Sequence, residues 1–207
     1  MFETNLRLLE ATREATLRQT AHLTPEQASR RPSPQAWSVA EVLEHLLISE
    51  TLYREMIARL IGLYRSGRRP SLSQGLADID TVPPFVPKEL LRLMDIPLTM
   101  MNLFVPPFVR ERMMTIRLFK AQSPTIARPK ADKPVDQLRA ELAESVCATA
   151  RLLRDNADVD FRRLRYSHPV LGANNVMGIL RIVAFHEKRH QQQIDEILSS
   201  QSFPKAA

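Results

Sequence analysis

Apolar residues recur with helical spacing in two stretches near the start of the chain. Residues 3 to 20 place leucines among charged side chains at this spacing, which predicts a first amphipathic helix. The stretch LTPEQASRRP predicts a short helical turn capped by Thr24. Ser38 and Glu41 then form an S-x-x-E capping box, and apolar residues follow with helical period. We therefore predict a second helix of about 25 residues that ends near Gly62 to Gly67.

The segment from residue 68 to 134 differs, because it contains ten prolines. Proline removes a backbone donor and clashes with the preceding turn, so no long helix is expected at this density. We predict short helices around 87 to 95 and 107 to 119. Five of the eight methionines lie between residues 94 and 114, which indicates an adaptable binding surface or, as we favour, flexible packing onto the core. We interpret approximately residues 66 to 133 as an insertion.

The helical pattern returns in the second half of the chain. A third helix is predicted to begin with Pro134 in its first turn and to continue through Leu153. After a loop with turn residues, a fourth is predicted from about Asn174 to Ser199. No stretch alternates convincingly between apolar and polar residues, so we predict an all-α four-helix bundle that forms a single domain over residues 1 to 207. The long connection between the second and third helices allows those two helices to lie parallel.

Composition and charge exclude several classes of protein. No apolar stretch is long enough for a membrane span and the N-terminus does not resemble a signal peptide, so we expect a cytoplasmic location and no membrane partner. Cys147 is the only cysteine; it cannot form an internal disulfide, and we predict that it is a small buried core residue. The net charge of +6 comes from residues 65 to 133, and without an aromatic platform we favour a solvated basic surface over nucleic-acid binding.

The pentapeptide HEKRH, residues 186 to 190, fits the H-E-x-x-H pattern of zinc metalloproteases. The extended form of that pattern requires a glycine at position 193 and a histidine at position 196, where this chain has Gln193 and Glu196. No strand is predicted that would hold a peptide substrate by backbone pairing. A zinc peptidase is therefore the least favoured interpretation.

His186 and His190 lie one helical turn apart on one stripe of the fourth helix. That stripe also carries Ile179, Ile182, Val183, Ile194 and Ile197. Burying two imidazoles there costs free energy unless each nitrogen finds a partner, either a shared divalent ion or separate hydrogen bonds. His22, His45 and His168 remain as candidates for a third ligand. Of these, we choose His45, which lies largely on the inward stripe of the second helix.

Two further polar residues accompany the histidines of the fourth helix. Glu187 lies beside His186, where it is a candidate for a contact with the ligands, a salt bridge or an inter-helix cap. Gln193 falls one turn beyond His190 and could orient its ring or simply pack with a backbone partner. Both residues are therefore candidates for contacting the histidine ligands rather than the metal itself.

The segments QAWSVAEVLEHLLISE, HPVLGANN and FHEKRHQQQI, in this order and separation, resemble the DinB/YfiT-like metal-binding four-helix bundles. The resemblance covers roughly residues 1 to 64 and 134 to 200, and the insertion is longer than the linker expected for this family. It implies that His45, His186 and His190 form a three-histidine site for a divalent metal. It also implies an up-down-down-up bundle, for which a long crossover between the second and third helices is required.

Three neutral histidines leave a coordination position open, as in catalytic rather than structural zinc sites. Imidazole ligands suit several metals, of which we expect zinc or nickel first. The resembling family includes S-transferases that use low-molecular-weight thiols, which implies a small-molecule thiol cosubstrate, a small electrophile and a detoxification activity. The alternative is a non-catalytic interaction protein that a metal stabilises. The resemblance and the apolar insertion also suggest a homodimer.

Overall fold

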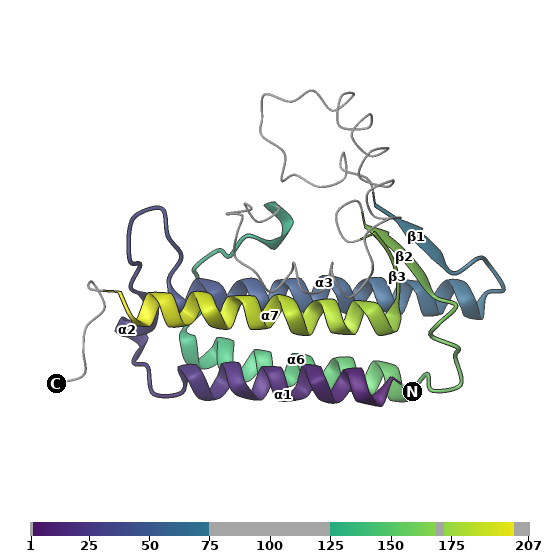
Figure 1. Cartoon of the computed structure of the whole chain (residues 1–207), viewed down its shortest axis with the longest axis horizontal. Coiled ribbons are helices and arrows are strands. Elements are labelled where there is room, and N and C mark those ends of the chain that lie inside the picture. Colours follow the sequence, from purple (N-terminus) through teal and green to yellow (C-terminus); the bar gives the residue numbers. More distant parts are fainter. Residues whose placement is uncertain (1, 75–124, 169–171, 201–207) are drawn as a thin grey trace, which may run out of the picture.

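Four long helices pack side by side along the length of the molecule (Figure 1). The computed structural model describes residues 2–74, 125–168 and 172–200. The long helices are α1 (Glu3–Thr20), α3 (Val39–Arg65), α6 (Val135–Arg154) and α7 (Val176–Leu198). Both α1 and α3 contact α6 and α7. The predicted helical bundle is confirmed.

Short-range capping contacts set where the helices begin. Thr24 caps the five-residue helix α2 (Pro25–Ser29) through a capping box with Gln27. Ser38 caps α3 in the same way with Glu41, as predicted. At α6 the prediction was off by one residue, because Pro134 is the extended N-cap residue and not part of the first turn.

A small three-stranded sheet at one end of the bundle corrects the prediction that the chain contains no strand (Figure 1). Its strands are β1 (Ser71–Ser73), β2 (Arg165–His168) and β3 (Gly172–Asn175). The central strand β2 pairs in parallel with β1 and antiparallel with β3. The sequence pattern missed these strands because each has only three or four residues, too few and too polar for alternation to show.

The long connection between α3 and α6 is described only at its two ends. Its described parts contain β1 and the short 3-10 helix η2 (Thr125–Ala127). The helices predicted around 87 to 95 and 107 to 119, the methionine-rich stretch and most of the predicted insertion lie outside the described residues.

Two apolar clusters fill the bundle, one toward each end. One is built around Leu6, Leu60 and Leu180, and the other around Leu43, Leu142 and Ile194. Between them, each long helix contributes polar residues to a buried polar layer: Thr12, Arg13, Thr16, Ser49, Glu50, Ser145, Thr149, Glu187 and His190. The candidate chemistry of the chain is therefore concentrated between the two clusters.

Cys147 is exposed on α6, so the prediction that it belongs to the core is wrong. Its neighbours in SVCATA include buried residues such as Val146 and Ala150, but one step along a helix turns a side chain by about 100°. Position 147 therefore points outward. None of the described helices is long and apolar enough to cross a membrane.

Candidate metal centre

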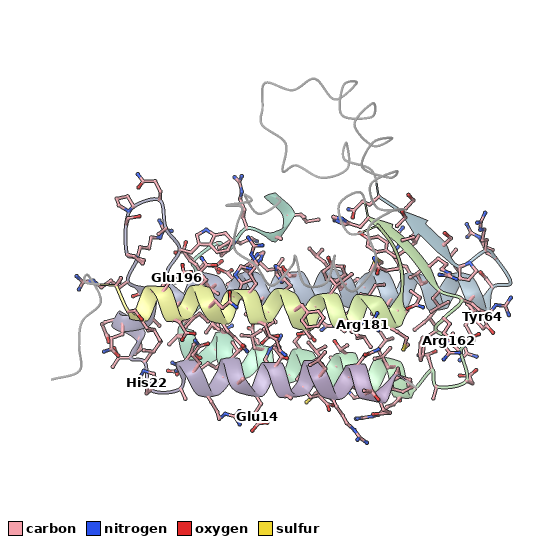
Figure 2. All side chains as sticks on the ribbon, viewed as in Figure 1. Glu14, His22, Tyr64, Arg162, Arg181 and Glu196 are labelled. Atoms are coloured by element: carbon pink, nitrogen blue, oxygen red, sulfur yellow. The ribbon has the colours of Figure 1, made fainter. Side chains whose placement is uncertain are left out.

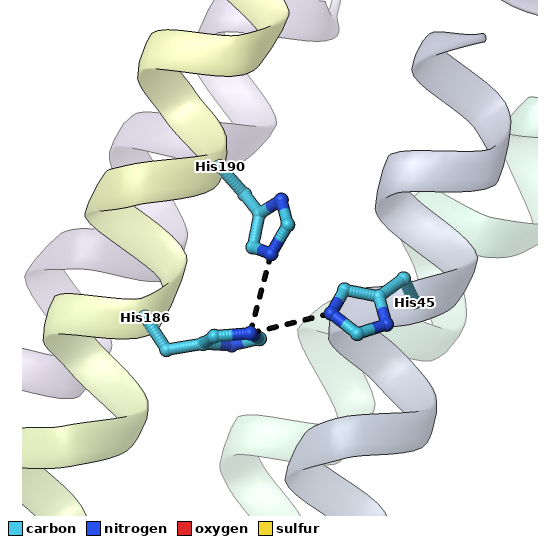
Figure 3. A group of neighbouring side chains, drawn as sticks. All are labelled: His45, His186 and His190. Carbon is cyan, nitrogen blue, oxygen red and sulfur yellow. Dashed lines mark hydrogen bonds between the residues drawn. The ribbon is translucent and has the colours of Figure 1, made fainter. Parts of the chain in front are cut away.

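Three imidazoles from two helices converge within the bundle (Figure 3). His45 projects from α3, and His186 and His190 project from α7. The Nε2 atom of His186 lies 3.2 Å from the Nε2 of His45 and 3.2 Å from the Nε2 of His190. Ligand atoms of the three residues all lie within 4.8 Å of one another. The structure thus brings together the three residues that were expected to form the site.

Hydrogen bonds on the far side of two rings direct their Nε2 atoms toward the centre. The Nδ1 of His45 lies 2.7 Å from the carbonyl oxygen of Ala127, and the Nδ1 of His190 lies 2.9 Å from Oε1 of Gln193. Both partners accept hydrogen bonds, so both Nδ1 atoms carry the proton and donate it. The Nε2 lone pairs of His45 and His190 are consequently available to a ligand at the centre.

The surroundings of His45 and His186 favour the neutral, metal-binding form of these two rings. Burial lowers the pKa of His45, and the hydrogen bond to Ala127 offsets only part of that effect. Burial and repulsion from His190 and His45 hold the pKa of His186 well below its ordinary value, with a further contribution from Arg189. His45 and His186 are therefore expected to lack a second proton near neutral pH.

The nitrogen positions fit a divalent ion better than they fit hydrogen bonds among the rings. Because Nδ1 carries the proton in His45 and His190, their Nε2 atoms can only accept hydrogen bonds. His186 could carry one proton on Nε2, and it could donate that proton to only one of these two neighbours. Two nitrogens bound to one tetrahedral zinc ion at about 2.05 Å would lie about 3.3 Å apart. The separations from the Nε2 of His186 to the other two Nε2 atoms, 3.2 Å each, are close to that value. The donor set and its spacing therefore suit a shared metal ion.

Comparison with known proteins places this arrangement in a family. The model of the DinB superfamily matches residues 8–194. The chain belongs to the DinB superfamily. Among solved structures, it is similar to YfiT from Bacillus subtilis, which is described as a probable metal-dependent hydrolase with an unusual four-helix bundle topology. That match has a TM-score of 0.55 and 14% identity, and it covers 98% of this chain and 89% of YfiT. A search of curated proteins found no match.

In this DinB-superfamily chain, Trp37 forms an aromatic wall beside the histidines. Its ring centroid lies 5.0 Å from that of His45 and 6.4 Å from that of His190, with the rings of Trp37 and His190 nearly parallel. The sequence prediction used Trp37 only as part of the family motif and gave it no place at the site. A half-buried tryptophan next to a candidate metal centre limits access from that side.

Trp37 is the only tryptophan, so its fluorescence reports on this site alone. Adding Co²⁺ or Ni²⁺ to the metal-free protein is expected to lower that fluorescence, because these open-shell ions quench an adjacent indole. Zn²⁺ has a filled d shell and is expected to quench much less while competing for the same site. A fluorescence titration measures both effects. Equal quenching of the His45→Ala variant at the same metal concentrations would contradict binding at the three histidines.

Glu187 takes part in a buried ionic cluster on the face of α7 that packs against α1. Its Oε1 accepts hydrogen bonds from Arg13 Nε at 2.9 Å and Thr16 Oγ1 at 2.7 Å, and its Oε2 accepts from Arg13 Nη2 at 3.0 Å. Of the contacts anticipated for Glu187, the structure shows the salt bridge. A glutamate held in this way is not placed to act as the base of an H-E-x-x-H peptidase.

The guanidinium of Arg13 joins all four long helices. It also lies 2.9 Å from Oε2 of Glu50 on α3 and donates to the carbonyl oxygen of Leu142 on α6. Burial by itself lowers the pKa of Arg13, but the charges and hydrogen bonds of Glu187 and Glu50 outweigh it and raise the pKa above its ordinary value. The sequence prediction missed Arg13, although it continues the inward stripe of Leu6, Leu9 and Thr16 at helical spacing.

Gln193 contacts His190 directly, through the hydrogen bond described above. We expect Gln193→Leu to lower the affinity for a divalent metal about tenfold, because the Nδ1 proton of His190 loses the acceptor that orients the ring. Isothermal titration calorimetry measures this. The matched control is Gln192→Leu, a change at the exposed neighbouring glutamine, and an equal loss in both variants would argue against orientation by Gln193.

The two remaining histidines lie elsewhere in the chain. His22 is exposed where α1 ends (Figure 2). His168 is the last residue of strand β2 in the small sheet. Burial lowers the pKa of His168 to about 4. Neither joins the histidine group within the described residues.

Proposed function

We propose that His45, His186 and His190 bind one divalent metal ion, zinc or nickel, and that the chain is a metal-dependent thiol S-transferase acting on a small electrophile. The observation that carries the proposal is the convergence of the Nε2 atoms of three imidazoles. In the described parts of the chain, no cysteine or carboxylate completes this group as a fourth ligand. Such a donor set leaves room for an exogenous ligand.

A divalent ion held there would lower the pKa of a bound thiol or water, so that thiolate or hydroxide forms near neutral pH. The residues of the chain contribute orientation and exclusion of water. Ala127 and Gln193 hold two imidazoles in the tautomer that presents Nε2. Trp37 covers one side of the rings. Cys147 is exposed and outside the histidine group, so the reacting sulfur has to come from a cosubstrate.

The experiment compares metal-loaded wild type with the His45→Ala variant, using a panel of low-molecular-weight thiols and an aryl halide. In the expected reaction the thiolate sulfur forms a bond to the ring carbon, halide leaves, and the thiol proton passes to buffer. Thioether formation above the metal-free control with at least one thiol, lost in His45→Ala, is the expected result. A stoichiometric metal content without conjugation with any thiol would favour a non-catalytic, metal-stabilised protein.

Hydrolysis is the second candidate, and the likeness to YfiT supports it because that protein is described as a probable metal-dependent hydrolase. Here water replaces the thiol at the same histidines. The same preparations are tested on activated esters and amides with no thiol present. Metal-dependent hydrolysis without any thiol-dependent product would select this candidate over the transferase.

We also propose the helix order up-down-down-up for the bundle. Its support is the parallel pairing of β1, which follows α3, with β2, which follows α6. The direction of the ribbons in Figure 1 agrees with this order. Small-molecule partners, a cytoplasmic location and homodimerisation stay predictions.

A further inference from the structure

Two consecutive residues of α3 hold the same distant segment, residues 127 to 131. Oε2 of Glu44 accepts hydrogen bonds from the backbone N–H groups of Lys130 at 2.9 Å and Ala131 at 2.8 Å. The next residue, His45, donates from Nδ1 to the carbonyl oxygen of Ala127. Glu44 is only 3% exposed, and Ala127 is 6% exposed. One short segment is therefore attached to a carboxylate and to a candidate metal ligand at once.

The backbone of this segment has a conformation that needs an external partner. Ala131 has a φ of 59°, in the left-handed region that residues with a Cβ rarely adopt. Successive N–H groups around such a residue point the same way and form a concave site for an anion. The carboxylate of Glu44 occupies that position, and its charge strengthens both hydrogen bonds.

The position of Ala127 determines what the ring of His45 presents to the centre. With the carbonyl oxygen in place, the proton stays on Nδ1 and the lone pair stays on Nε2. Without it, the tautomer with the proton on Nε2 becomes accessible, and that proton would lie where a metal has to bind.

We propose that Glu44 is a positioning residue of the metal centre. By holding the N–H groups of residues 130 and 131, it keeps the carbonyl of Ala127 against His45, and so keeps the Nε2 lone pair of His45 directed at the other two histidines. Its effect on metal affinity rests on the proposed function. Its effect on the tautomer of His45 applies to the metal-free protein as well.

The first experiment measures that tautomer without metal. The ring ¹⁵N shifts of His45, assigned by comparison with His45→Asn, are expected to show a protonated Nδ1 in wild type. Glu44→Met fills the same space without an acceptor and is expected to shift His45 toward a mixture of tautomers. Glu44→Gln keeps a carbonyl that can accept both N–H groups, and its His45 signals should resemble those of wild type. Unchanged His45 shifts in Glu44→Met would overturn the proposal.

A matched control comes from Glu41, one turn earlier on α3, which is also buried and bound to backbone. Glu41→Met removes the capping box and the ion pair with Arg31, so it lowers stability without touching residues 127 to 131. Its His45 shifts are expected to match those of wild type. A tautomer shift as large as that in Glu44→Met would assign the effect to general destabilisation and would also overturn the proposal.

The second experiment measures Co²⁺ affinity by the fluorescence of Trp37 and by calorimetry. Glu44→Met is expected to bind about 10- to 100-fold more weakly than wild type, with Glu44→Gln much closer to wild type. A folded Glu44→Met variant that binds Co²⁺ as tightly as wild type would overturn the positioning role. Wild type that binds no metal would overturn the proposed function, and in that case the tautomer measurement alone decides the role of Glu44.

Discussion

His45→Ala is expected to lower the affinity for a divalent metal by more than about 100-fold, because loss of a ligand costs more than loss of a residue that only orients one. His45 is the single ligand from α3, whereas His186 and His190 both come from α7. Without it, the two remaining imidazoles are neighbours on one helix and form a much weaker pair. Metal content after dialysis, together with a calorimetric titration, measures the change.

The control for that experiment is His22→Ala, which removes an exposed histidine where α1 ends. Its metal content is expected to equal that of wild type. Far-ultraviolet circular dichroism establishes that both variants keep their helices. Retention of one equivalent of metal by a folded His45→Ala would exclude His45 from the ligands.

Arg13→Met is expected to lower the free energy of unfolding by about 3–5 kcal/mol, the usual cost of removing one partner from a buried ion pair. Arg13 is 1% exposed, and without its guanidinium the carboxylates of Glu50 and Glu187 stay buried with no opposite charge between them. Urea unfolding followed by circular dichroism gives the difference.

Three companion variants test the physical reason. Arg18→Met removes an exposed ion pair with Glu14 on the same helix and is expected to change stability by less than about 0.5 kcal/mol. Arg13→Lys keeps the charge but loses the bidentate hydrogen bonds to Glu187. Its loss of stability is therefore expected to lie between those of Arg18→Met and Arg13→Met. Adding Glu50→Gln and Glu187→Gln to Arg13→Met is expected to recover part of the loss. Unfolding of Arg13→Met at the wild-type urea concentration would contradict the prediction.

Helix spacing and capping explain why the bundle could be predicted from the sequence. The bounds of α1, α3 and α7 lie within about two residues of the predicted ones, because Ser38, Glu41 and the apolar stripes act locally. The strands could not be predicted, because three or four residues carry too little pattern and their pairing partners are far away in sequence. Cys147 was misplaced because its neighbours suggested burial while its helical phase did not.

The sequence predicted some residues of the candidate site and missed others. Spacing indicated His186 and His190, and the inward stripe of α3, together with the family resemblance, indicated His45. Arg13, in the polar layer beside the histidines, was not predicted. A charged residue is normally exposed, so Arg13 was not considered for the interior. The contacts of Ala127 and Ala131 involve a backbone carbonyl and a backbone N–H group, which any residue type supplies. Nothing in the sequence distinguishes those positions.

The polar layer between the two apolar clusters also selects one alignment of the helices. Leucine, isoleucine and valine side chains would tolerate a helix shifted by one turn, about 5.4 Å, since one apolar contact replaces another. Arg13 would not, because its partners on α3, α6 and α7 are single groups at fixed heights. His45 and the pair on α7 meet in the same alignment that satisfies Arg13. The contacts of Arg13 with Glu50 on α3 and Glu187 on α7 thus favour the helix positions in which the three histidines lie together.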